Sequence, residues 1–113
     1  MVNFIRWTRV AAWVATLVLA VASWTPAEDM IRTGMGGLYE HAIAYFVTGT
    51  AFMWGYRDRS PWQFVVALSI YAAVLEVGQL AVPGRHAGLL DWAAGATGVL
   101  CAALLMVAWQ ARG

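Results

Sequence analysis

Apolar residues dominate the chain in four long runs, which short polar segments separate. A membrane-spanning helix needs roughly 20 mostly apolar residues, and the runs lack the strict polar–apolar alternation of a barrel strand. The pattern predicts an all-α, polytopic membrane four-helix bundle that forms one domain over residues 1–113. The predicted helices cover about residues 7–24, 37–56, 61–82 and 89–109.

Two prolines support these boundaries, and the first run has an alternative interpretation. Pro61 suits the first position of a helix because only an unpaired amide is lost there. Pro83 with Gly84 stops the third helix.

The segment before Ser23, with its basic start and the residues Ala-Val-Ala at 20–22, also resembles a cleavable signal peptide. An uncleaved first span is the preferred interpretation.

Composition agrees with a membrane protein. Hydrophobic residues make up 62% of the chain and charged residues 12%, against about 25% charged in soluble domains. The net charge of +1 and the scattered arginines argue against a nucleic-acid partner. A single cysteine, Cys101, excludes an internal disulfide and a Cys-rich metal site. Membrane lipids are therefore the expected surroundings.

Arginines predict the orientation. With four spans, both termini and the 57–59 loop lie on one side, which holds five arginines, whereas the other side holds Arg32 and Arg85. Positively charged flanks stay cytoplasmic, so the prediction is N-in and C-in. Tryptophans near span ends fit an interfacial belt: Trp7, Trp24, Trp54, Trp62 and Trp109.

Polar residues gather where the second and fourth spans begin and the third ends. Residues three or four apart share one helix face, so each predicted helix presents its polar residues together. The residues brought to this outward end are His41, Tyr45, Glu76, Gln79, Arg85 and Asp91.

Glu76 is the most informative of these residues. If the third helix ends at Val82, Glu76 lies six residues inside, or roughly 9 Å at 1.5 Å per residue. A charge at such a depth costs a few kcal/mol and needs a partner. The candidates are His41, Gln79 and Arg85, and the prediction is that Arg85 reaches back to Glu76.

The fourth span carries a stripe of small residues on the same face as Asp91. Gly95, Gly98 and Ala102 follow Asp91 at spacings of four, three and four. Small residues on one face let helix backbones approach closely. The stripe is therefore expected to pack against another helix.

Together these residues resemble the VanZ-like membrane protein family over about three quarters of the chain. The matching patterns are H-x-x-x-Y, E-x-x-Q, P-G-R and an aspartate followed seven residues later by glycine. In this sequence they are His41 with Tyr45, Glu76 with Gln79, 83–85, and Asp91 with Gly98.

The chain departs from the family pattern at two places. Gly37 and Leu38 stand where the family usually has an Asp-Lys pair, and Gly95 stands where it commonly has asparagine. The resemblance implies a multi-pass protein of the bacterial cytoplasmic membrane. It also implies a link to glycopeptide susceptibility, because the founding member is associated with low-level teicoplanin resistance.

Three hypotheses for function follow. The outward cluster binds a cell-envelope or anionic lipid-like ligand, because arginine suits phosphate and carboxylate. Alternatively, the cluster only locks the helices together. In a third hypothesis, His41 and Glu76 form an acid–base pair of an outer-leaflet enzyme. No catalytic residue, metal site or cofactor is assigned, since no serine elbow, phosphate loop or metal motif is present.

Overall fold

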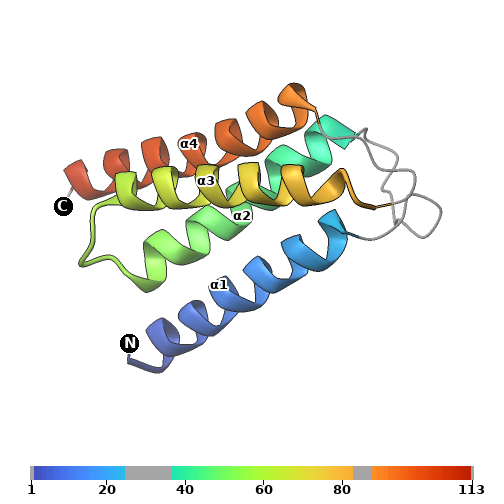
Figure 1. Cartoon of the computed structure of the whole chain (residues 1–113). Coiled ribbons are helices and arrows are strands. Elements are labelled where there is room, and N and C mark those ends of the chain that lie inside the picture. Colours follow the sequence, from blue (N-terminus) through green and yellow to red (C-terminus); the bar gives the residue numbers. More distant parts are fainter. Residues whose placement is uncertain (1, 25–36, 83–87, 113) are drawn as a thin grey trace.

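The computed structural model describes residues 2–24, 37–82 and 88–112. These residues form four α-helices: α1 (Val2–Ser23), α2 (Gly37–Gly55), α3 (Pro61–Gln79) and α4 (Leu89–Arg112). The helices lie side by side in a body that measures 47 × 26 × 25 Å (Figure 1). The described part of the chain is therefore all-helical, as predicted.

The four helices are not equivalent in their packing. The interface between α2 and α4 is the most extensive, α3 packs mainly on α4, and α1 packs mainly on α2. Within the described ranges, α1 touches α3 at a few positions and does not contact α4. Helix α1 thus lies at one edge, and α2 with α4 forms the centre.

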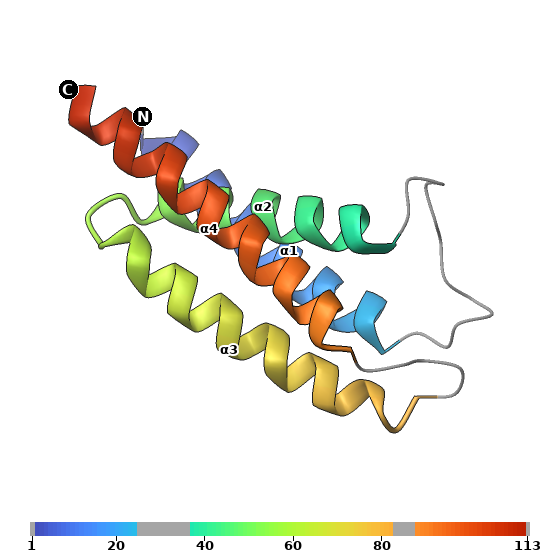
Figure 2. The same cartoon turned by 90° about the horizontal axis from the view of Figure 1, so that it is seen from above.

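One end of the molecule holds both termini. The two ends of the chain lie beside the turn between α2 and α3, in both views (Figures 1 and 2). The opposite end holds the last turns of α1 and α3 and the first turns of α2 and α4. The polar positions of α2, α3 and α4 that the sequence singled out lie toward this second end.

Three helices are long and apolar enough to cross a membrane, namely α1, α3 and α4. Their composition indicates a membrane protein. Helix α2, whose 19 residues include Glu40, His41 and two tyrosines, is not among them. Large apolar side chains cover much of the described surface, along α1 in particular, as expected where lipid replaces water around a protein.

Helix α3 begins as predicted but ends three residues early. The Ser60 hydroxyl accepts a hydrogen bond from the Trp62 amide at 3.3 Å, and Pro61 takes the first helical position. After Gln79, the amides of residues 80–82 bond three residues back, a tighter turn that often closes helices. Proline at 83 disfavours helical geometry in the residue before it. The predicted end at Val82 was therefore wrong.

This early end corrects the expected depth of Glu76. Glu76 lies three residues from the last residue of α3, or about 4.5 Å along the axis, and not six residues from it. The other helix boundaries that differ from the prediction do not move a residue of the predicted site. Helix α1 begins at Val2, and α4 continues to Arg112, where Gln110, Ala111 and Arg112 favour helix.

The small-residue stripe of α4 packs against α2, as predicted. A side chain at Gly98 would overlap the carbonyl group of Ala42. One turn further, Ala102 lies opposite Gly49, and a methyl group at Gly49 would be 3.5 Å from the Ala102 Cβ. The absence of a side chain at 98 brings the two helices together close to the polar end.

Candidate functional site

Glu76 lies at the meeting point of three helices. Its residue is 7% exposed, and its Oε2 accepts a hydrogen bond from the Gly88 amide at 2.8 Å. Gly88 directly precedes α4, and its carbonyl accepts from the Trp92 amide at 3.2 Å. The carboxylate therefore holds the start of α4, where free amides and the helix dipole favour a negative charge.

His41 of α2 faces the other oxygen of this carboxylate. Its Nε2 is 3.9 Å from Glu76 Oε1, which is too long for a hydrogen bond. Oε1 is buried and has no hydrogen-bond partner among the described residues. The His41 side chain is 21% exposed, so this pair reaches the surface on the histidine side.

The ring of the buried Tyr45 packs against the His41 ring. The two rings lie 5.3 Å apart between centroids, with a tilt of 39°, and Tyr45 is 1% exposed. A Cβ at Gly95 would be 3.0 Å from the Tyr45 ring. A side chain at 95 would therefore require the Tyr45 ring to shift by a few tenths of an ångström.

Gln79 and Asp91 are two further residues of the predicted site at this end of the molecule. Gln79 lies one turn after Glu76 on α3 and is 2% exposed. Asp91 lies in the first turn of α4, with Oδ2 3.7 Å from where a Cβ of Gly88 would be. We call these five residues the Glu76 cluster: His41, Tyr45, Glu76, Gln79 and Asp91.

One residue of the predicted site, Arg85, lies outside the described residues. Its contact with Glu76 stays a prediction. Within the described ranges, no three His, Cys, Asp or Glu side chains lie close enough to hold a metal ion. Among the described residues, the structure thus brings the Glu76 carboxylate and the His41 imidazole together.

The sequence did not reveal the backbone partner of Glu76. Gly88 donates this hydrogen bond through its main-chain amide, and a pattern of side chains does not predict such a donor. A signal was available, since the residue before a helix has an amide that the helix itself does not use. Two indole groups were also missed as links between helices: Trp24 Nε1 donates to the Leu75 carbonyl, and Trp92 Nε1 donates to the Ser69 carbonyl.

Two grooves lie away from the Glu76 cluster. The larger, of about 730 Å³, follows α1, and the second, of about 340 Å³, lies between α1 and α2. Neither is lined by a residue of the cluster. The cluster is a buried polar junction whose exposed part is the His41 side.

Comparisons with protein-family models, with curated proteins and with solved structures give no match. The resemblance to VanZ-like proteins therefore stays a prediction from the sequence motifs alone.

Proposed function

We propose that this chain is a VanZ-like multi-pass protein of the bacterial inner membrane. In this proposal all four helices cross the membrane, both termini are cytoplasmic, and the Glu76 cluster faces outward. The arginine distribution supports this orientation, since five arginines belong to the end with the termini and two to the other.

We further propose that the Glu76 cluster binds the polar part of a cell-envelope ligand. The observation that supports this is the buried Glu76 Oε1, which has no hydrogen-bond partner among the described residues and faces His41 at 3.9 Å. A buried carboxylate oxygen that accepts no hydrogen bond is costly, even with an imidazole 3.9 Å away. A donor from a ligand would remove that cost.

The chemistry of the cluster favours a ligand with both hydroxyl and acidic groups. A hydroxyl would donate to Glu76 Oε1, whereas a phosphate or carboxylate would bind His41 and the predicted cation Arg85. Lipid-linked cell-wall precursors carry both kinds of group. Binding such a ligand would connect the protein with susceptibility to teicoplanin, as the family resemblance implies.

Ligand binding by two matched variants tests this proposal. Glu76→Gln alters the carboxylate of the cluster, and Asp58→Asn alters an exposed carboxylate at the other end. A hydrogen bond to a charged group contributes about 1.5–3 kcal/mol. We therefore expect Glu76→Gln to bind a lipid-linked wall precursor at least about tenfold more weakly, and Asp58→Asn to bind as the wild type does.

The same variants expressed in cells should change teicoplanin susceptibility in the same order. Arg85→Ala serves as a further variant for the predicted cation. Equal affinity of the wild type, Glu76→Gln and Arg85→Ala for the precursor would refute ligand binding at this cluster.

A second proposal is that the cluster only locks the helices together. The hydrogen bond from Gly88 to Glu76 supports it, because it joins the start of α4 to the end of α3. A lock predicts that Glu76→Gln lowers the unfolding temperature in detergent without any change in precursor affinity. Ligand binding predicts a loss of affinity beyond any loss of stability.

A further inference from the structure

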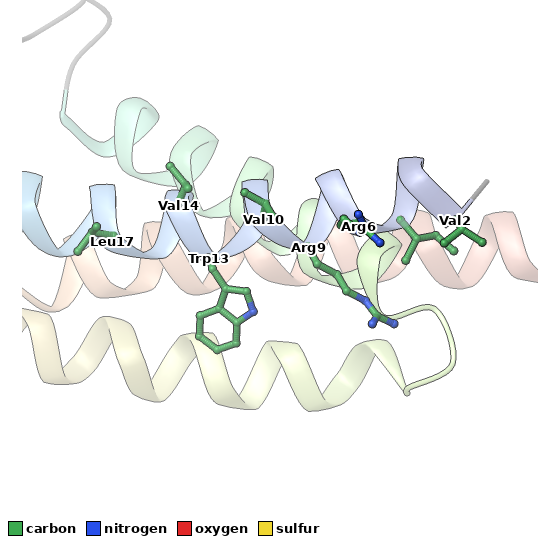
Figure 3. Close-up of a pocket in the computed structure, with 8 residues that line it drawn as sticks. Val2, Arg6, Arg9, Val10, Trp13, Val14 and Leu17 are labelled. Carbon is green, nitrogen blue, oxygen red and sulfur yellow. The ribbon is translucent and has the colours of Figure 1, made fainter.

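The groove along α1 combines two arginines with an apolar wall. Its lining residues recur at spacings of three and one, which places them on one face of the helix. Figure 3 shows the row from its arginine end to its apolar end. Those that matter here are Arg6, Arg9, Val10, Trp13, Val14 and Leu17.

Arg9 is held in place at the polar end of this groove. Its Nε donates to the Gly55 carbonyl at 2.6 Å, and its guanidinium carbon lies 4.4 Å from the centroid of the Tyr56 ring. Trp13 joins the same arrangement, because its Nε1 donates to the Tyr56 hydroxyl at 3.0 Å. The guanidinium is therefore positioned by contacts that use only part of its five donors.

The length of the row matches one leaflet of a bilayer. Arg6 and Leu17 are eleven residues apart on α1, which corresponds to about 16 Å of helix. Half of a hydrocarbon core is about 15 Å. A lipid whose head group contacts the arginines would thus have its acyl chain against Val10, Val14 and Leu17.

The charge at this end favours an anionic head group. Arg6 and Arg9 lie at the end that also holds Arg57, Arg59 and Arg112, against one carboxylate, Asp58. A second copy of the chain fits the groove poorly. Two parallel copies would place like charges together, and the apolar wall lacks the small residues that membrane helix interfaces favour.

We propose that the α1 groove is a binding site for an anionic phospholipid, with its phosphate on Arg6 and Arg9 and an acyl chain along α1 toward Leu17. The site lies at the opposite end from the Glu76 cluster, so the inference holds independently of what that cluster binds.

Lipid titration of the purified full chain in a neutral detergent tests this proposal. The probes are dioleoyl phosphatidylglycerol and the zwitterionic dioleoyl phosphatidylcholine, with bound lipid measured by native mass spectrometry. One arginine near a membrane surface contributes about fivefold in affinity. We expect phosphatidylglycerol to bind more tightly than phosphatidylcholine, Arg6→Gln to weaken it about fivefold, and Arg6→Gln with Arg9→Gln to weaken it about 25-fold.

Arg59→Gln is the matched control, because it removes an exposed charge at the same end outside the groove. It should weaken binding clearly less than Arg6→Gln does, because Arg59 does not line the groove. Arg9 also binds the Gly55 carbonyl, so if Arg9→Gln does not fold, the comparison of Arg6→Gln with Arg59→Gln still decides.

Three results would overturn the proposal. Equal effects of Arg6→Gln and Arg59→Gln would show that the charge of the whole end, and not the groove, attracts the lipid. Equal affinity for the two phospholipids would exclude head-group recognition. A dimer that persists in excess lipid and that Val14→Asn disrupts would assign the groove to a second copy.

Discussion

Gly98 and Gly49 show how two glycines in one interface differ in their tolerance of a side chain. At Gly98 a Cβ would overlap the backbone of Ala42, which cannot move without shifting α2. At Gly49 the nearest atoms to a Cβ, on Val99 and Ala102, lie at 3.5 Å, an ordinary contact distance. The first glycine is required by the close approach of two helices, and the second is not.

We therefore expect Gly98→Ala to lower the free energy of unfolding by about 2 kcal/mol or more, since overpacking against a backbone is costly. Gly49→Ala should be neutral or slightly stabilising, because alanine favours helix over glycine. Unfolding of both variants in the same detergent checks this pair. A similar loss in both would contradict the assignment of the closest approach to Gly98.

Residue patterns predicted the small-residue face of α4 but not its partner atoms. The spacing of Gly95, Gly98 and Ala102 predicted helix packing, and α2 occupies that face. The expected distance of Glu76 from the helix end was wrong, because α3 ends at Gln79 and residues 80–82 form a tighter turn. The Gly88–Glu76 bond could not be predicted from residue types, because its donor is a backbone amide.

At the scale of the elements, α1 depends on a few specific links to the rest of the molecule. The Tyr71 hydroxyl donates to the Thr16 carbonyl at 2.5 Å, and Trp24 Nε1 donates to the Leu75 carbonyl at 3.2 Å. The Trp24 indole lies so close to Gly78 that a Cβ there would be 2.5 Å from Nε1. Gly78 thus leaves room for the indole of Trp24, the residue that directly follows α1.

A double-mutant cycle tests this contact between Gly78 and Trp24. Gly78→Ala should displace Trp24 and lower the free energy of unfolding by about 1–2 kcal/mol. In a Trp24→Ala background the same change should cost much less, because the indole is gone. The expected coupling energy is at least about 0.5 kcal/mol, and additive effects in detergent unfolding would refute the contact.

These links also bear on the alternative that α1 is a signal peptide. Arg9 of α1 donates a hydrogen bond to the Gly55 carbonyl, and the Thr16 carbonyl accepts one from the Tyr71 hydroxyl. Helix α1 is therefore packed as part of the folded structure. We expect the protein expressed from this 113-residue sequence to keep α1, so that its mass is the full 12.3 kDa of that sequence. A mass that lacks the residues before Ser23 would establish cleavage.

At the scale of the whole molecule, the hydrophobic pattern predicted four helices and their order, and the described residues contain all four. It did not predict that α1 stays apart from α4, because apolar faces look alike in sequence whether they contact lipid or another helix. The shared end of the two termini follows from four antiparallel helices and is seen in both views (Figures 1 and 2).

The central claim is that the Glu76 cluster faces outward while both termini are cytoplasmic, and cysteine labelling tests it most directly. In a Cys101→Ala background, single cysteines are placed by Leu89→Cys, at the exposed start of α4, and by Asp58→Cys, in the exposed turn between α2 and α3. A membrane-impermeant maleimide should label Leu89→Cys in intact spheroplasts, and Asp58→Cys only after permeabilisation. Labelling of Asp58→Cys in intact spheroplasts, with Leu89→Cys protected, would contradict the account.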